Sequence, residues 1–408
     1  MTFLSSLVSA APRASVEDPT RPLTDATLLT LFGGDKASSG VSVTPEKSLG
    51  VTAVWRAVNL IAGTCASLPL HAYEQDGDAR KRRTTGHAAA LLANPHPDLT
   101  PLELWETVYA HIALWGNAYL WKLRDQSGQI RELWPIHPAR VKVGRATAGG
   151  AKIFEVDGEP ETEQHILHIP GFGFDGTVGV SPVTAARQGL GLALAAEEFG
   201  AKFFGSGTLA TGILRTEQKL SPGKADELQE RWQAKRAGLG NAHSTIVLDS
   251  GADFTQLTIP PDDAQFLETR KFQVAEVARM FGVPPHMLMD TDRSTSWGTG
   301  IEQQGIGFVV YTLRPWLTRV EQRVSQMVRP ESVYARYSVE GLLRGDSTQR
   351  QAFYQGMWNL GAFSTNEIRA LEELPPVDGG DVRYRPLNMG LLGEADTAMT
   401  PQEATQNA

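Results

Sequence analysis

One stretch of the sequence, residues 262–329, most constrains how this chain can fold. Apolar residues recur every three to four positions over 262–281, and this spacing predicts a helix. Gly282 then frees the backbone, and Pro284 and Pro285 prevent the helix from continuing. We therefore expect a helix break at Gly282, Pro284 and Pro285.

A polar loop and a second, longer helix are expected after that break. Residues 284–299 are rich in Asp, Ser, Thr and Gly, which is a loop composition. From Gly300 apolar residues return at helical spacing over about eight turns. Pro315 lies inside this helix, where its ring would clash with the carbonyl of Tyr311, so we expect a kink and not an end. An ordinary helical hairpin in a protein core would give the same pattern.

Composition narrows the class of protein. The 408 residues, 41% of them hydrophobic and 21% charged, describe a globular chain of two or three domains. The one cysteine, Cys65, excludes an internal disulfide and a multi-cysteine zinc site, and its apolar helical face predicts a buried thiol. The net charge of −8 argues against tight nucleic-acid binding by the whole surface. No apolar run is long enough to predict a membrane-spanning helix.

The N-terminal half reads as an arm followed by an α+β unit. Residues 1–48 are interrupted by Pro, Gly and Ser, and we expect a flexible arm. Helices and short strands then alternate over 49–180, and a Thr-x-x-Glu capping box at 100–103 opens one of the helices. Residues 75–85 contain Arg80-Lys81-Arg82-Arg83. We expect a solvated turn there, with contact to phosphate or to an acidic partner as the alternative.

The second half divides into further segments. A helix with many small residues is expected over 181–205, and a small α/β insert of strands and one charged helix over 206–260. One strand is expected after the long helix. Two more helices fall within 346–392, the second with a Ser-x-x-Glu cap at 364–367. The polar tail 393–408 has the composition of a disordered segment.

The sequence motifs of catalysis and cofactor binding lack the neighbouring elements or partner residues that such sites require. The run 171–176 matches G-x-G-x-x-G, but no helix opens directly after it, so we do not expect dinucleotide binding. His165 and His168 point to opposite faces of a strand and make a poor metal pair. Asp290 and Asp292 could share a metal ion, although a hydrated loop explains them as well. We therefore predict no enzyme activity, no metal site and no cofactor.

Several short motifs, in their order along the chain, resemble a known family. They include Val51-Thr-Ala-Val-Trp-Arg-Ala-Val-Asn-Leu-Ile-Ala, Leu114-Trp-Gly-Asn-Ala-Tyr, Leu133-Trp-Pro-Ile-His-Pro, Ala278-Arg-Met-Phe-Gly-Val-Pro-Pro and Pro376-Val-Asp-Gly-Gly-Asp. Each motif is weak alone, and the ordered set is specific. The sequence resembles, over about residues 45–390, the portal proteins of tailed double-stranded-DNA bacteriophages of the HK97 type.

The resemblance implies a portal fold assembled as a ring, twelve-fold in virions, at one capsid vertex. It assigns 49–180 to the wing, the helices 181–205 and 261–283 to the stem, and 206–260 to the clip. It assigns 284–299 to the tunnel loop, 300–345 to the long kinked helix and a wing strand, and 346–392 to the crown. The implied partners are other copies of the chain, the terminase large subunit, the head–tail adaptor, the major capsid protein and duplex DNA.

The resemblance also implies two groups of functional residues. The tunnel loop would present Met289, Asp290, Thr291, Asp292, Arg293 and Ser294 to the channel axis. Because a strongly basic channel would hold DNA and slow its passage, we expect a polar lining in which Arg293 is the exception. The clip would offer a basic set for docking the motor or the adaptor, unless these residues form only a solvated helix face: Lys219, Lys224, Arg231, Lys235 and Arg236.

Two other classes of function stay open from the sequence. One is a metal-dependent nucleotide hydrolase that uses Asp290 and Asp292. The other is a virion adaptor or scaffold protein without a channel. A measurement of particle mass separates a ring from both.

Overall fold

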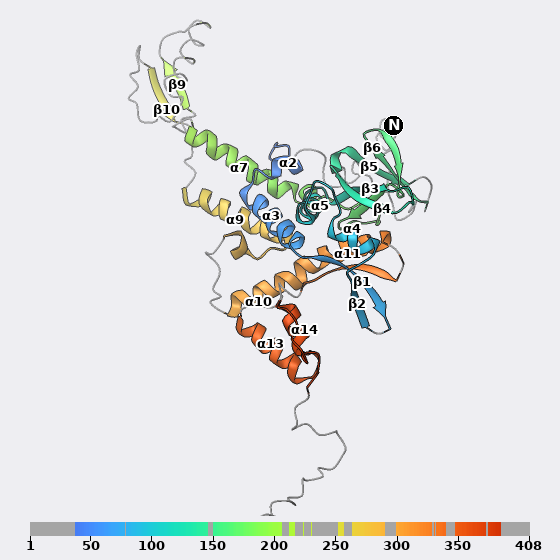
Figure 1. The fold of residues 1–408 in the computed structure, drawn as a ribbon. Coiled ribbons are helices and arrows are strands. Elements are labelled where there is room, and N and C mark those ends of the chain that lie inside the picture. The colour runs from blue at the N-terminus through green and yellow to red at the C-terminus, as the bar shows by residue number, and fades with distance from the viewer. Residues whose placement is uncertain are drawn as a thin grey trace, which may run out of the picture. The chain divides into compact units, whose positions relative to one another are not determined.

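The structure, a computed structural model, describes residues 37–77, 79–145, 150–205, 212–216, 223, 230, 252–256, 263–289, 299–328, 330, 332–339, 347–372 and 374–384. The chain divides into two compact units, Met1–Ser338 and Val339–Ala408. The first unit combines helices with small antiparallel sheets (Figure 1). The fold is therefore α+β, as the sequence predicts.

The helices of the first unit fall close to their expected positions, except α2, which lies in the segment predicted as a flexible arm. They are α2 (Pro45–Ser48), α3 (Thr52–Ala66), α4 (His87–Ala93), α5 (Pro101–Trp115), α6 (Pro182–Ala185), α7 (Arg187–Gly205), α9 (Asp263–Phe281), α10 (Thr299–Gly307) and α11 (Arg314–Met327). Helix α5 begins with the predicted capping box, in which the Thr100 side chain accepts from the backbone of Glu103 and the Glu103 side chain accepts from that of Thr100. Both bonds satisfy amide groups that the first turn of a helix leaves without a partner.

The strands form four antiparallel sheets among the described residues. β1 (Leu70–Asp76) pairs with β2 (Ala79–Arg83) and β11 (Val333–Tyr337), in the order β11-β1-β2. β3 (Asn117–Arg124) lies between β4 (Ile130–Ile136) and β8 (Ile166–Pro170). A third sheet has the order β5-β6-β7, and a two-stranded sheet pairs β9 with β10; their strands are β5 (Val141–Arg145), β6 (Lys152–Val156), β7 (Glu159–Thr162), β9 (Gly212–Thr216) and β10 (Ala252–Gln256).

The core of the first unit lies where helices α3 and α5 pack together and onto the sheets. Ile61, Leu104 and Trp105 are buried there, and so is Cys65, as predicted. Burial raises the pKa of the Cys65 thiol to about 12, so this cysteine is protonated and inert at neutral pH. A second apolar cluster, which includes Tyr119, lies between the β4-β3-β8 and β5-β6-β7 sheets.

The basic segment at residues 80–83 is a strand and not the solvated turn that we expected. β2 pairs residue by residue with β1, from Ala72 opposite Arg83 to Asp76 opposite Ala79. Gly77, which lies between the two strands, has a positive φ of 58°. The prediction was wrong because it took the run of charged residues as a sign of a turn. An edge strand with one face in solvent also accepts charged residues readily.

Part of the expected N-terminal arm is packed against the first unit. Ala37 is buried, and the amide of Ser38 donates to Oε1 of Gln188 in α7 at 2.9 Å. Gly191 makes this possible, because a Cβ at that position would lie 2.3 Å from the side chain of Ala37. The flexible arm can therefore extend no further than residue 36, and residues 1–36 lie outside the described ranges.

Glycines in the run 171–176 and just after it serve backbone packing. The amide of Gly171 donates to the carbonyl of Gly116 at 2.7 Å, and a Cβ on Gly179 would lie 2.0 Å from that same oxygen. The Asn117 side chain accepts from the Gly179 amide and donates to its carbonyl. Three chain segments thus meet at distances that only glycine allows.

The second unit contains the two predicted C-terminal helices, α13 (Ser347–Asn359) and α14 (Thr365–Leu371). The expected cap at Ser364 is a full capping box with Glu367. The side chain of Asn366, in the first turn of α14, accepts from the Val377 amide at 2.8 Å and donates to the Val377 carbonyl at 3.0 Å. These bonds hold the turn that the Pro375-Pro376 sequence begins.

Candidate functional site

The helix break at Gly282 gives the candidate site its frame. Helix α9 ends at Phe281, and Gly282 takes a left-handed φ of 67°. The amide of Val283 donates to the carbonyl of Ala278 at 3.0 Å, and that of Gly282 donates to Arg279 at 3.4 Å. These two bonds form a Schellman motif, which turns the chain sharply away from the helix axis. Pro284 and Pro285 then open a short 3₁₀ helix, η3 (Pro285–Leu288).

Two side chains from distant parts of the sequence hold this turn. The Thr312 hydroxyl donates to the carbonyl of Gly282 at 2.6 Å. The Arg56 guanidinium, from α3, donates through Nε to the carbonyl of Met287 at 3.3 Å. The start of the predicted tunnel loop is thus fixed to α3 on one side and to the long helix on the other.

The long helix continues through Pro315, as expected. A π-helical segment, η4 (Phe308–Leu313), separates α10 from α11 and ends just before the proline. Because proline has no N–H, the carbonyl of Tyr311 cannot have its usual helical partner, and a wider turn removes the steric conflict with the ring. The bend that we expected at Pro315 stays a prediction.

The structure brings only one of the six predicted channel residues into view. Met289 has a left-handed φ of 64°, its amide donates to the carbonyl of His286, and its side chain is 78% exposed. Asp290, Thr291, Asp292, Arg293 and Ser294 lie outside the described residues. The basic clip residues Lys219, Lys224, Arg231, Lys235 and Arg236 also lie outside them.

Helices α7 and α9, which flank the predicted clip, pack against each other. The Arg270 guanidinium lies 3.7 Å from the Glu197 carboxylate and links the two helices. Large apolar side chains on this pair remain exposed, among them Leu192 at 50% and Phe272 at 54%. Exposed apolar surface on paired helices is typical of a surface that packs against another chain.

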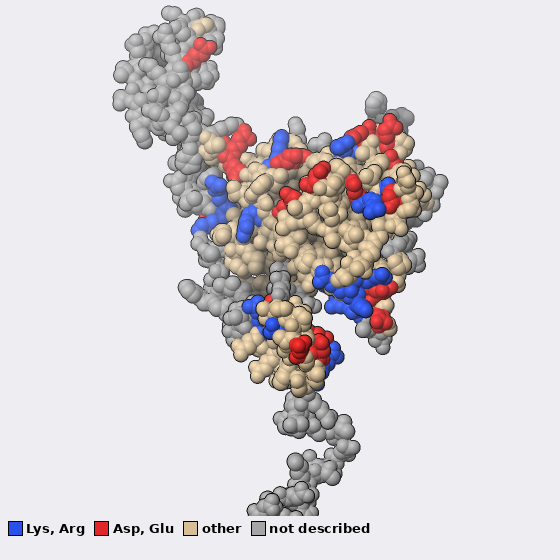
Figure 2. Space-filling model, in the orientation of Figure 1, with Lys and Arg blue, Asp and Glu red and all other residues tan. Residues whose placement is uncertain are grey.

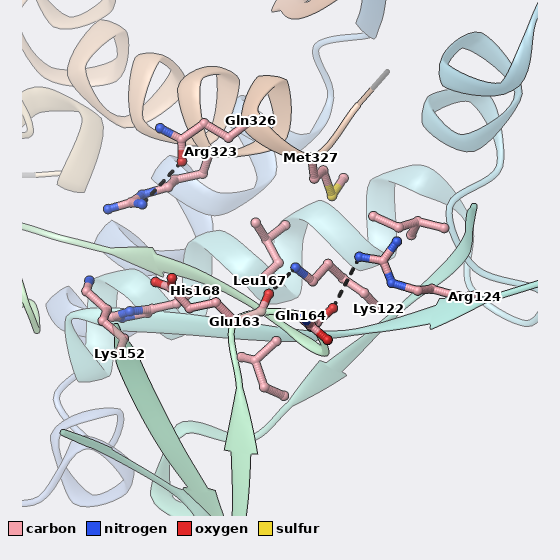
Figure 3. A pocket seen from close by; sticks show the side chains of 12 residues that line it. Lys122, Arg124, Lys152, Glu163, Gln164, Leu167, His168, Arg323, Gln326 and Met327 are labelled. Carbon is pink, nitrogen blue, oxygen red and sulfur yellow. Dashed lines mark hydrogen bonds between the residues drawn. The ribbon is translucent and has the colours of Figure 1, made fainter. Parts of the chain in front are cut away.

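A basic cavity of about 380 Å³ lies between α11 and strands β3 and β8 (Figure 3). Four cationic residues and one carboxylate are among those that line it: Lys122, Arg124, Lys152, Arg323 and Glu163. The sequence gives no signal for this cluster, because its members come from segments up to about two hundred residues apart.

The two lysines of this cavity are buried and donate to main-chain carbonyls. Lys122 Nζ donates to Glu163 at 2.5 Å, and Lys152 Nζ donates to Gly176 at 3.1 Å and to Thr177 at 3.0 Å. Burial, with a further contribution from the Arg124 guanidinium, lowers the pKa of Lys122 to about 8. The two lysines therefore fix the main chain at residue 163 and at residues 176–177, although burying their positive charges costs free energy.

His168 adjoins the same cavity and is held neutral. Its Nε2 lies 3.0 Å from Oδ1 of Asn117, an oxygen that also accepts from the Gly179 amide. The imidazole therefore donates from Nε2. Burial, with the charges of Lys152 and Arg323, lowers the pKa of His168 well below its usual value. His165 lies in the turn before β8, and not on the strand as we expected, and it pairs with Glu161 outside the cavity.

Neither a metal centre nor a membrane span is present in the part of the chain that the structure describes. Within these residues no three His, Cys, Asp or Glu side chains lie together as metal ligands would. None of the described helices is long and apolar enough to cross a membrane.

The sequence matches the phage portal protein family over residues 52–373, which is most of the chain. The chain belongs to the phage portal protein family. It is 36% identical over 380 residues to a probable portal protein of Streptomyces phage phiC31, covering 88% of this chain and 83% of that protein. It is 35% identical over 356 residues to the portal protein of Enterobacteria phage HK97, covering 84% of this chain and 83% of that protein.

Solved structures agree with this assignment at the level of the fold. An HK97 family phage portal protein from Corynebacterium diphtheriae aligns with a TM-score of 0.58 and 20% identity, covering 75% of this chain and 99% of that one. A chain from the neck of a native GTA particle, computed with C12 symmetry, aligns with a TM-score of 0.51 and 22% identity, covering 86% of this chain and 98% of that one. The portal fold predicted from the sequence is confirmed.

Proposed function

We propose that this portal protein forms a closed ring at one vertex of a capsid, through which double-stranded DNA is packaged and later ejected. The observation that carries the proposal is the family match, which spans both stem-like helices, the loop between them and the long helix. Supporting it are the exposed apolar side chains of α7 and α9, which a ring of adjacent copies would cover.

The parts of the chain take the following roles in this proposal. Residues 49–180 form the wing, α7 and α9 form the stem, and 206–260 form the clip. Residues 289–294 form the part of the tunnel loop that faces the axis, 300–345 form the long kinked helix and a wing strand, and 346–392 form the crown. Copies of this chain are the immediate partners. The terminase large subunit and the head–tail adaptor bind at the clip, the major capsid protein surrounds the ring, and the ring assembles in the host cytoplasm.

In this proposal the channel lining contacts DNA only weakly, so that the DNA can move through the ring. DNA carries a negative charge about every 1.7 Å along its axis, so a strongly basic lining would retain it. The chain carries a net charge of −8, and a ring of such chains repels DNA from most of its surface. In the tunnel loop, Arg293 supplies one cation among Asp290, Asp292 and uncharged residues.

Native mass spectrometry and negative-stain imaging of the purified chain test the ring directly. A large ring with a central hole is the expected result, and a single-chain particle under assembly conditions would refute the proposal. To test the loop, a photo-crosslinking residue at Asp292 should react with DNA trapped in packaged particles, while the same group at the exposed Leu123 in β3 serves as the comparison. The same group is also placed on the outside of the clip, and crosslinks from there alone, with none from Asp292, would show that the loop does not line the channel.

The same material tests the alternative of a metal-dependent nucleotide hydrolase. Asp290→Asn and Asp292→Asn together should leave any divalent-metal binding and nucleotide hydrolysis unchanged. A loss of both on this change would favour the hydrolase, and a protein that stays monomeric without hydrolysis would favour an adaptor.

A further inference from the structure

The solvent face of the β11-β1-β2 sheet carries a concentration of positive charge. Strand alternation separates the residues of this sheet: Leu70, Ala72, Val333, Ala335 and Tyr337 are buried on one face, and their neighbours in sequence point outward. The outward set is His71, Tyr73, Gln75, Arg80, Arg82, Tyr334 and Arg336. We call it the basic sheet face.

The register of the strands brings these outward residues together. Arg82 lies opposite Tyr73, and Arg336 lies opposite His71. Tyr73 and Tyr334 are also directly opposite, with their rings 6.1 Å apart and nearly parallel. The Arg80 guanidinium lies over the Tyr73 ring, 5.5 Å from its centre. Cations and aromatic rings thus lie side by side on one face of three strands.

The carboxylates of this sheet lie on the face opposite the basic sheet face, together with Lys81 and Arg83. Glu74 bonds to Arg83 at 3.1 Å and lies opposite Lys81, all on the other side of the sheet. Among the described residues the basic sheet face has no carboxylate, and within these residues neither Arg82 nor Arg336 has an ion pair. Partial burial and the Arg82 charge both lower the pKa of His71. In a chain with a net charge of −8, such a face marks a contact with a polyanion.

The shape and spacing of the basic sheet face suit a phosphate backbone. Arg80 and Arg82 lie two residues apart on β2, a separation of about 6.8 Å along an antiparallel strand. Arg336 lies two strand spacings away, about 9.6 Å across the sheet. The tyrosine hydroxyls and the guanidinium groups are the donors that contact phosphate oxygens without reading sequence.

The position of the basic sheet face within the first unit indicates which polyanion it would contact. Figure 1 places the β1–β2 hairpin and the C-terminal end of α7 at opposite ends of this unit, and Figure 2 shows Lys and Arg side chains gathered over the hairpin. In the proposed function α7 leads to the clip, which docks the motor outside the capsid. The hairpin then faces the capsid interior, where packaged DNA is concentrated.

We propose that the basic sheet face binds the backbone of packaged duplex DNA outside the channel, on the side of the ring that faces the capsid interior. The proposal rests on the proposed function for this orientation, and on the register and charge of the sheet for the binding itself.

Covalently closed circular DNA separates this surface from the channel, because a closed circle cannot thread an intact ring. The full-length assembled protein is titrated with a closed circular plasmid, and the affinity is measured from about 50 to 200 mM salt. The test variant is Arg80→Gln with Arg82→Gln and Arg336→Gln. The matched control removes three exposed cations outside the β11-β1-β2 sheet, each of which has a carboxylate partner. It combines Arg131→Gln, Arg140→Gln and Lys142→Gln.

The expected result is that the wild type and the control bind the plasmid alike, while the test variant binds at least about tenfold more weakly. Its plot of log K against log salt should be shallower by about 0.9 for each phosphate contact removed. Equal affinity and slope for all three proteins would overturn the proposal. A second result would also overturn the proposal: the wild type does not bind the plasmid, and the test variant fails to assemble. The basic sheet face would then be a contact between protein chains. Native mass of each sample shows separately whether the ring itself exists.

Discussion

The Thr312 hydroxyl donates a hydrogen bond of 2.6 Å to the carbonyl of Gly282, thirty residues earlier in the chain. This bond joins the end of one predicted stem helix to the π-helical segment of the long helix. The same threonine lies 3.0 Å from where a Cβ on Gly282 would be. The chain turn before the tunnel loop is therefore specified from both sides, by backbone conformation and by contact.

Replacing Gly282 should destabilise the protein twice over. Gly282→Ala forces a side chain into a left-handed conformation, at about 1 kcal/mol. It also pushes against Thr312, which should raise the total to about 2 kcal/mol. Gly128→Ala is the matched control, since Gly128 has a φ of 80° with nothing within 4 Å of the added Cβ. Chemical unfolding at one protein concentration measures both, and equal losses would show that Thr312 yields without cost.

Removing only the hydroxyl of Thr312 should loosen the base of the tunnel loop. Thr312→Val keeps the shape of the side chain but removes the donor to Gly282, at a cost of about 0.5–1.5 kcal/mol. Amide exchange at Val283 and Met287 should become faster, because the turn loses one of its two side-chain anchors. Thr318→Val is the comparison, since the Thr318 hydroxyl donates within its own helix to Arg314 at 2.9 Å. Unchanged exchange at the turn in Thr312→Val would mean that Arg56 alone holds it.

Much of this arrangement follows from local sequence. Thr100 with Glu103, and Ser364 with Glu367, begin helices where predicted, because a capping box needs only residues three apart. The break after Phe281 is equally local, since Gly282 and two prolines decide it. Features that depend on residues a few positions apart are thus visible without a structure.

The unpredicted features all depend on long-range contacts. Nothing in the sequence near Gly282 indicates Thr312 as its partner, and the π-helical turn before Pro315 is one of several ways to accommodate a proline. The run Arg80 to Arg83 looks like a solvated turn until pairing with β1 makes it a strand. Arg80 and Arg82 then share one face of the sheet with Tyr334 and Arg336, which lie some 250 residues later. The candidate DNA-contacting face is therefore a product of strand register and not of a motif.

Ring assembly should depend on apolar side chains that one chain leaves exposed on the stem helices. Burying a large apolar side chain contributes about 1.5–3 kcal/mol, so Leu192→Asp with Phe272→Asp should remove several kcal/mol from each contact between copies. Native mass should then show monomers or open fragments where the wild type shows rings. Leu123→Asp, at an exposed position of β3, provides a control that should still assemble. Intact rings in the double variant would place the contacts between copies elsewhere.

Stability should rise between about pH 8 and pH 10, because Lys122 carries a proton less readily in the folded chain than in the unfolded one. Its folded pKa is about 8, lowered first by burial and then by Arg124, against an ordinary value of 10.5. Below pH 8 both states hold the proton and the fold bears the cost of a buried charge. Between the two pKa values the unfolded state binds more protons, so stability increases with pH. Partial solvent screening limits the gain to about 2 kcal/mol.

Lys122→Met should flatten this rise, since methionine fills a similar volume and has no proton to lose. Chemical unfolding at pH 7, 8, 9 and 10 measures the slope directly, with assembly state checked at each pH. Lys142→Met is the matched control: Lys142 is exposed and paired with Glu155 at 2.5 Å, so its replacement should leave the slope intact. The slope is the informative quantity, because Lys122→Met also removes the hydrogen bond to Glu163 and so shifts stability at every pH. A wild-type slope that persists in Lys122→Met would assign the proton to Lys152, whose pKa burial also lowers.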